Sequence, residues 1–311
     1  MTMSMTKPDR IAAGRRIGAR HLPGRDARLG LLLIAPIVVV MGALVLLPLV
    51  LTAWDSLYRI DPMRAGTPFI GAANYINLAS DPEVRAAAAN TMWIVLLAVI
   101  LETVGGVAVA LLLQSMGPIR KWLLAAIILP WAMPSVVNSL IWSWMFNPSY
   151  GVLNAILHGL GLIPAGYVWS NDRTAALLLI TIVHVWKMMP MTAVIMLAAL
   201  QTIPTHLYEA AKIDGAGPVR TFFSITLPMT MGALAIAMTQ STVSAFNLFD
   251  EAWILGGASL DTRTLLIQVY MSAFQNLHMS YGMALSILVL IASLAVSLIY
   301  VARRRGETQG E

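Results

Sequence analysis

Residues 91–113 read TMWIVLLAVILETVGGVAVALLL, a run of 23 amino acids in which Glu102 is the only charged side chain. A helix that crosses the hydrocarbon core of a bilayer needs about 20 mostly apolar residues. The run is continuous and does not alternate between apolar and polar positions, which argues against a membrane-spanning β-strand. The run therefore predicts a transmembrane helix.

Five other stretches have the same character, and segments with Pro, Gly, Asn and charged residues separate them. We expect membrane spans at residues 29–54, 91–113, 122–146, 174–200, 228–249 and 281–301. The first stretch, residues 29–54, is longer than the apolar region of a signal peptide, and five comparable runs follow it. We therefore expect it to remain in the mature protein as a membrane span. The predicted fold class is all-α: a polytopic membrane protein with six transmembrane helices.

The composition agrees with this class. Of the 311 residues, 58% are hydrophobic and 11% are charged, and the mean hydropathy is +0.76. Soluble domains carry roughly 25% charged residues, and disordered chains combine low hydrophobicity with dense charge. Both classes are therefore excluded. The absence of cysteine also excludes disulfides and thiol catalysis.

The basic residues predict the orientation. If the N-terminus is cytoplasmic, 14 of the 20 Lys and Arg residues lie in cytoplasmic segments and five lie in external loops, as the positive-inside rule requires. We therefore expect a membrane protein with both termini in the cytoplasm. Its parts are a basic tail at 1–28 that contacts membrane lipid, a six-span transmembrane domain at 29–302 and a C-terminal tail at 303–311. Membrane topology accounts for the net charge of +5, so no nucleic-acid partner is expected.

The chain lacks the motifs of several enzyme classes. None of its four lysines follows a glycine, so no Walker A phosphate loop is present. The five histidines have no metal-ligand spacing, and no G-x-S-x-G nucleophile motif occurs. We expect no catalytic residue, no metal and no cofactor. Uphill transport would then draw its energy from an ion gradient or from another subunit.

The segment between the fourth and fifth spans, residues 201–228, reads QTIPTHLYEAAKIDGAGPVRTFFSITLP. Pro204 suits the first position of a helix, Gly215 can adopt the positive φ that ends one, and Pro218 can open another. We expect two short helices with a break between them. The physics of this segment allows either an elbow that docks on another protein or an amphipathic connector that lies on the membrane surface.

The same segment resembles the EAA loop of permease subunits in binding-protein-dependent ABC importers. That pattern is E-A-A, three residues, G, nine residues and I-x-L-P. Glu209-Ala210-Ala211, Gly215 and Ile225-x-Leu227-Pro228 match every fixed position. The chain further resembles the carbohydrate branch in these residues: Phe69-Ile70-Gly71, Leu129-Pro130, Phe146-Asn147-Pro148, Gly151-Val152-Leu153-Asn154, Trp186-Lys187-x-x-Pro190 and Phe246-Asn247-x-Phe249-Asp250. Residues 255–260 depart from the branch's usual turn.

The resemblance implies an assembly in a prokaryotic cell membrane, in which residues 29–302 form the permease domain. It consists of this permease, a second permease subunit, two ATP-binding cassette ATPase subunits and an extracytoplasmic solute-binding protein, and its solute is a sugar or related polyol. The resemblance also implies that a coupling loop, residues 202–227, inserts into a groove of the ATPase. The residues implied to sit in this groove are Glu209, Ala210, Ala211, Asp214, Gly215 and Ala216.

Polar residues inside membrane spans cost free energy unless they have a hydrogen-bond or ion-pair partner or contact water. Lys187, with Trp186, either lines the solute pathway or fixes helix packing through an ion pair, for example with Glu102. Gln240, Ser244 and Asn247 either donate hydrogen bonds to a polyol or bond neighbouring helices. We expect His184 to lie in the core.

Two other functions fit the composition. A secondary transporter driven by protons or sodium would use Glu102 and Lys187 as a relay, and a membrane scaffold would have no solute path. Both lack a role for the pattern at residues 209–228.

Overall fold

A computed structural model describes residues 24–308, and its contacts divide the chain into two units at Leu51. Most of the expected basic tail (residues 1–23) and the last three residues lie outside the described range. Within residues 24–308 every regular element is helical, apart from one isolated antiparallel bridge between Tyr58 and Phe69. The all-α prediction is confirmed.

The first unit is a single apolar helical rod. It comprises α1 (Gly24–Met41), a π-helical turn at Gly42–Leu46 and the beginning of α2 (Leu47–Asp55), which crosses the division. Residues 30–55 form a candidate span with a mean hydropathy of 2.9 and no buried residue in its most apolar window. Lipid solvates such a surface, so the exposed leucines and valines of this rod are what a span requires.

The second unit contains the other elements, several of them broken or short. After α2, its α-helices in chain order are α3 (Ala73–Ser80), α4 (Pro82–Ser115), α5 (Arg120–Ala132), α6 (Ser135–Met145), α7 (Val152–Gly159), α8 (Arg173–Leu200), α9 (Thr205–Ile213), α10 (Pro218–Thr221), α11 (Leu227–Phe246), α12 (Asp250–Gly256), α13 (Leu265–Tyr270) and α14 (Met279–Thr308).

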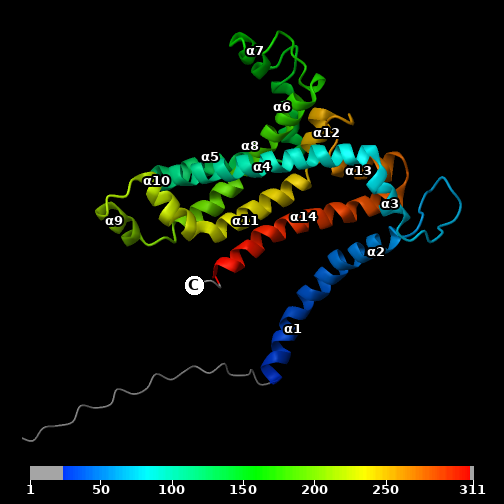
Figure 1. The fold of residues 1–311 in the computed structure, drawn as a ribbon, viewed down its shortest axis with the longest axis horizontal. Coiled ribbons are helices and arrows are strands. Elements are labelled where there is room, and N and C mark those ends of the chain that lie inside the picture. Colours follow the sequence, from blue (N-terminus) through cyan, green and yellow to red (C-terminus); the bar gives the residue numbers. More distant parts are fainter. Residues whose placement is uncertain (1–23, 309–311) are drawn as a thin grey trace, which may run out of the picture. The chain divides into compact units, whose positions relative to one another are not determined.

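Four long helices form the body of this unit. α4 packs along α8, α11 packs against both, and α14 packs against α11. Figure 1 shows α9 and α10 at one end of this body and α3 and α13 at the other. We refer to these as the α9 end and the α3 end. The helix order places every loop predicted to be cytoplasmic at the α9 end.

Small residues let α4 and α8 approach closely. A Cβ atom added at Gly106 would lie 2.5 Å from Thr192 Cγ2 and 3.1 Å from the backbone nitrogen of Ala193. Helices in lipid gain little from the hydrophobic effect when they associate, so close van der Waals packing at small residues stabilises them. The pair of glycines at 105–106 is therefore a packing feature of the α4–α8 contact.

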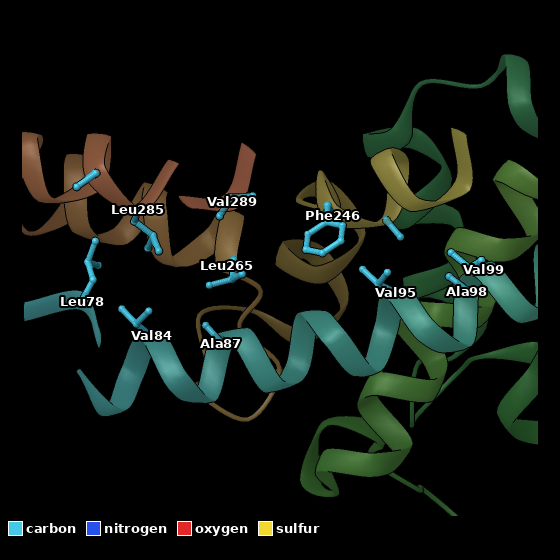
Figure 2. Close-up of a cluster of buried hydrophobic side chains, with 12 residues drawn as sticks. Leu78, Val84, Ala87, Val95, Ala98, Val99, Phe246, Leu265, Leu285 and Val289 are labelled. Atoms are coloured by element: carbon cyan, nitrogen blue, oxygen red, sulfur yellow. The ribbon is translucent and has the colours of Figure 1, made fainter. Parts of the chain in front are cut away.

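A cluster of buried apolar side chains joins α3, α4, α11, α13 and α14 toward the α3 end. Figure 2 shows Phe246 at the end of α11 facing Val95 on α4, with Leu265 and Leu285 beside the first turns of α4. Phe246 is the largest of the fully buried side chains. The end of α11 is thereby fixed on the middle of α4.

The predicted third span is broken. The helices at Gly117–Ala132 and Ser135–Met145 are bent by 94° relative to each other, and Figure 1 shows α6 turning away from the axis of α5. Pro134 disfavours helical geometry at Met133, which is extended with a ψ of 142°. The expectation of one continuous helix over 122–146 was wrong at this point. Within residues 24–308, five helices are long and apolar enough to span a membrane, or six if the bent pair is one span.

The predicted fifth span begins earlier than expected. Residues Pro218–Phe246 form one continuous helix of 29 residues, so the second helix of the expected elbow is the beginning of this span. Pro228 has no N–H to donate, and a π-helical turn at Phe222–Thr226 ends two residues before it. This turn lets the helix pass the proline. The span ends at Phe246 instead of residue 249, and the short helix α12 follows.

Prediction on the α4–α8 contact. Gly106→Ala should lower the melting temperature of the detergent-solubilised protein, because its methyl group meets Thr192 and backbone, and overpacking costs about 1–3 kcal/mol. Gly105→Ala is the matched control, because there the nearest atom is the flexible Met189 Sδ. Equal melting temperatures for the two variants would contradict the packing argument.

Candidate functional site

The loop between α8 and α11 contains the helix α9, which ends in a defined turn at Gly215. Gly215 has a φ of 70°, its N–H donates to the carbonyl of Lys212, and the N–H of Ala216 donates to the carbonyl of Ala211. These two bonds form a Schellman motif, in which a residue with positive φ closes the helix. The positive φ predicted for Gly215 is confirmed, and Pro218 opens the next helix as expected. Pro204 lies one position before α9 instead of at its first residue.

The loop presents acidic and small residues to the outside. Glu209, Ala210, Asp214 and Gly215 are exposed, and Ala216 is half-buried. Ala211 is different, because it is buried within this chain. Five of the six residues implied to meet an ATPase are thus at least partly accessible.

The loop is held firmly against the bundle. Leu207, Tyr208 and Ile225 pack on a buried cluster from α4, α8 and the segment after α8. The Tyr208 hydroxyl lies 3.1 Å from Thr226 Oγ1, which joins α9 to the beginning of the fifth span. A cavity of about 500 Å³ lies between the two arms of the loop, and Lys212, Ala216 and Phe222 are among the residues that line it.

Apolar side chains at the loop also remain uncovered. Ile213 is 87% exposed, and Val219 and Phe223 are exposed as well. Val219 and Phe223 lie one helical turn apart, whereas Thr226 further along the same helix is buried. Exposed apolar patches with a polar rim mark sites of interaction with protein or membrane.

A second group of polar residues is buried within the helical bundle. His184 on α8 lies between two carboxylates, with Nε2 3.5 Å from Glu102 Oε1 on α4 and Nδ1 3.9 Å from Glu251 Oε1 on α12. Ser241 on α11 donates a hydrogen bond to the other oxygen of Glu102. We call these four residues the His184 cluster. It joins four helices, and all four side chains are buried.

Lys187 lies one turn further along α8 and is also buried. Its Nζ donates to the hydroxyl of Ser135 at the start of α6. The pairing of Lys187 with Glu102 that the sequence left open does not occur, because His184 takes that position. The core location expected for His184 is correct. Glu251 was missed because it lies in a segment predicted to be the loop after the fifth span.

The other candidate pathway residues do not converge on one site. Trp186 is 37% exposed and contacts Trp142 edge-to-face, with ring centroids 5.4 Å apart. Gln240 is exposed and lines a separate cavity of about 400 Å³ between α8 and α11. Ser244 is half-buried. Asn247 donates to the carbonyl of Val243 at the end of α11.

In the part of the chain that the structure describes, no group of three His, Asp or Glu side chains could hold a metal ion. The contacts within the His184 cluster are those of the imidazole with the two carboxylates and the hydrogen bond from Ser241 to Glu102. With a protonated imidazole, His184 forms ion pairs to both carboxylates, and the cluster ties α4, α8 and α12 together.

Residues 102–306 match the protein family described as binding-protein-dependent transport system inner membrane component. The chain belongs to this family. The matched range contains the loop and the His184 cluster. Membership in a binding-protein-dependent system supports the permease interpretation over a stand-alone secondary transporter or a scaffold.

Curated relatives align with nearly the whole chain. The trehalose/maltose transport system permease protein MalF of Thermococcus litoralis is 35% identical over 278 residues, which cover 89% of this chain and 94% of that protein. The sulfoquinovosyl glycerol transport system permease protein SmoG of Agrobacterium fabrum is 32% identical and covers 91% and 92%. The trehalose transport system permease protein SugA of Mycobacterium tuberculosis is 30% identical and covers 92% and 93%.

Solved structures share the fold. A chain of a bacterial ABC transporter that imports the acidic polysaccharide alginate superimposes with a TM-score of 0.76 at 20% identity, covering 91% of this chain and 96% of the other. A second structure, of the alginate transporter in complex with a pentasaccharide-bound periplasmic protein, gives a TM-score of 0.74. At this identity the likeness establishes the fold alone.

Prediction on the His184 cluster. His184→Leu should destabilise the protein by about 3–5 kcal/mol, because removal of one partner leaves buried charges uncompensated. Adding Glu102→Gln to this variant should recover part of the loss, since one of the two facing carboxylates becomes neutral. Thermal unfolding in detergent measures both effects. His206→Leu, at an exposed position of α9, is the control. If His184→Leu unfolds at the same temperature as this control, the cluster does not stabilise the bundle.

Proposed function

We propose that this chain is the permease subunit of an ATP-driven importer for a sugar or related polyol. In this proposal it pairs with a second permease, receives its solute from an extracytoplasmic binding protein and is driven by two separate ATPase subunits. The observation that carries the proposal is the rigid, exposed loop around Gly215 in a chain of this family. ATP hydrolysis takes place on the partner ATPases.

The loop has the chemistry of a docking elbow. Glu209 and Asp214 present exposed carboxylates, which bind basic side chains by charge-assisted hydrogen bonds. Ala210 and Gly215 have little bulk and admit a close approach, and Ile213 adds an exposed apolar contact. In this arrangement Glu209, Ala210, Asp214, Gly215 and Ala216 contact the ATPase. Ala211 packs inward and supports them.

The elbow is connected to the bundle as a lever. α10 continues without a break into α11, and the helix at Pro218–Phe246 is about 43 Å long at 1.5 Å per residue. A displacement of α10 by the ATPase is therefore transmitted along α11 to Ser241, which binds Glu102 in the His184 cluster. Switching between inward-facing and outward-facing states then requires this cluster to move or to rearrange.

The distribution of charge supports a cytoplasmic α9 end. Arg120, Lys121, Lys212 and Arg220 belong to elements at the α9 end, where α5, α9 and α10 begin or end. By the positive-inside rule this end faces the cytoplasm of a prokaryotic cell. The α3 end then faces the binding protein, and both termini are cytoplasmic.

The solute pathway in this proposal follows α6 and α8. Trp186 offers an aromatic face, and Lys187 and Ser135 offer hydrogen-bond donors. Both polar atoms of the fully buried Asn138 amide lack a hydrogen-bond partner among the described residues. Named relatives transport trehalose, maltose and a sulfoquinovosyl glycerol. This supports a hydroxyl-rich solute. Gln240, Ser244 and Asn247 are further candidates along α11.

Prediction on coupling. Gly215→Val should abolish uptake by the whole importer, because a β-branched residue at a φ of 70° is strained and displaces the elbow. Gly215→Asn should retain much of the uptake, since asparagine tolerates this conformation. No atom lies within 4 Å of the added Cβ, so both variants should insert normally. Uptake of ¹⁴C-trehalose or ¹⁴C-maltose together with ATP hydrolysis measures coupling, and full uptake by Gly215→Val would refute the elbow.

Prediction on the pathway. Trp186→Ala should lower sugar uptake severalfold and leave ATPase association intact, because it removes the aromatic face beside Lys187. Trp186→Phe keeps such a face and should restore most of the uptake. Co-purification of the ATPase checks assembly. Wild-type uptake by Trp186→Ala would remove this residue from the pathway.

A further inference from the structure

A row of aromatic rings connects α8 to the loop between α6 and α8. Trp186 contacts Trp142, Trp142 stacks on Phe146, Phe146 contacts Trp169, and Trp169 contacts Tyr167. The ring centroids of neighbouring members lie between 5.0 and 5.7 Å apart. We call these five residues the aromatic row. Each of them retains partial exposure, so the rings keep accessible surface.

The far end of the row is rigidly oriented. The buried amide of Asn154 accepts a hydrogen bond from Trp169 Nε1 at 2.6 Å and donates to the carbonyl of Tyr167 at 2.8 Å. The only polar atom of the Trp169 side chain is thereby occupied. What this residue offers to its surroundings is an apolar ring in a fixed orientation, which is the state that binds a ligand at low entropic cost.

A small cavity lies beside these rings. It measures about 130 Å³, close to the space of about four water molecules at roughly 30 Å³ each. Phe146 and Trp169 line it together with the polar side chains of Ser143, Asn147 and Ser170. Asn147 Oδ1 already accepts hydrogen bonds from the backbone of Ser149 and Tyr150, so its amide nitrogen is the donor that remains for a ligand.

This lining matches one class of ligand. A pyranose has an apolar face of C–H groups and a rim of hydroxyls, and binding sites for such molecules combine aromatic surface with a few placed polar groups. None of the described residues that line this cavity is charged, which favours a neutral sugar. The volume admits one edge of a ring, and the remainder of a disaccharide stays outside.

We propose that the cavity bounded by Phe146, Asn147, Trp169 and Ser170 is a sugar-binding subsite beside the external loop between α6 and α8, where an incoming pyranose first binds before it moves along the aromatic row toward Trp186. The inference rests on the proposed function and adds to it a place of first contact. Trp169 binds the ring face, Ser143, Asn147 and Ser170 bind hydroxyls, and Asn154 is a positioning residue for Trp169.

Cysteine labelling tests occupancy directly, because the chain has no cysteine of its own. Ser170→Cys places a thiol at the cavity, and Ser149→Cys places one at an exposed position of the same loop. In the whole importer, maltose or trehalose should slow maleimide labelling of the S170C thiol severalfold and leave S149C unchanged. Mannitol, a polyol without a ring face, should protect neither. Equal labelling of S170C with and without the sugars would overturn the subsite.

Transport stoichiometry supplies the second readout. Trp169→Leu should lower severalfold the number of sugar molecules imported per ATP hydrolysed, while the loaded binding protein still stimulates the ATPase. Trp169→Phe should preserve the ratio, and Trp144→Leu, an exposed tryptophan outside the row, is the matched control. An unchanged ratio in Trp169→Leu would overturn the inference. Failure of the wild-type importer to take up either sugar would instead count against the proposed function.

Discussion

His184 lies between two carboxylates inside a bundle that lipid surrounds, and the long helices depend on this contact. Glu102 comes from α4 and Glu251 from α12, and each carboxylate faces one nitrogen of the same imidazole. Unpaired charges at this depth would be costly, so the helices that carry them must stay together. Ser241 extends the contact to α11. The cluster therefore fixes the relative positions of the elements that a transport cycle has to move.

The lever and the cluster meet on α11. One end of the continuous helix belongs to the elbow, and the other end is fixed on α4 by the buried ring of Phe246. Packed cores have discrete arrangements and do not deform continuously, so in the proposed cycle motion of the elbow is converted into a change between such arrangements. The π-helical turn before Pro228 lies between the elbow and the packed region. It is the point of the lever where the regular hydrogen-bond pattern already changes.

Local patterns predicted much of this molecule. Apolar length located the spans, and α8 begins and ends within one residue of the expected range. The turn at Gly215 was predicted because a helix end needs a residue that accepts a positive φ. The break at Pro134 was available in the sequence as well, since a proline restricts the residue before it. The hydropathy of residues 122–146 did not indicate this break. Hydropathy measures the transfer of side chains into lipid and does not depend on whether the helix is bent.

The sequence by itself determined the membrane class, the approximate spans and the form of the elbow, since each depends on neighbouring residues along the chain. Tertiary structure decided which polar side chains meet. Glu102 and Glu251 are 149 positions apart, and only the packing of α12 against α8 brings the second carboxylate to His184. The partner of Lys187 and the row of rings from Trp186 to Tyr167 were likewise fixed by the bend between α5 and α6. Long-range contacts of this kind depend on helix packing, which no local pattern encodes.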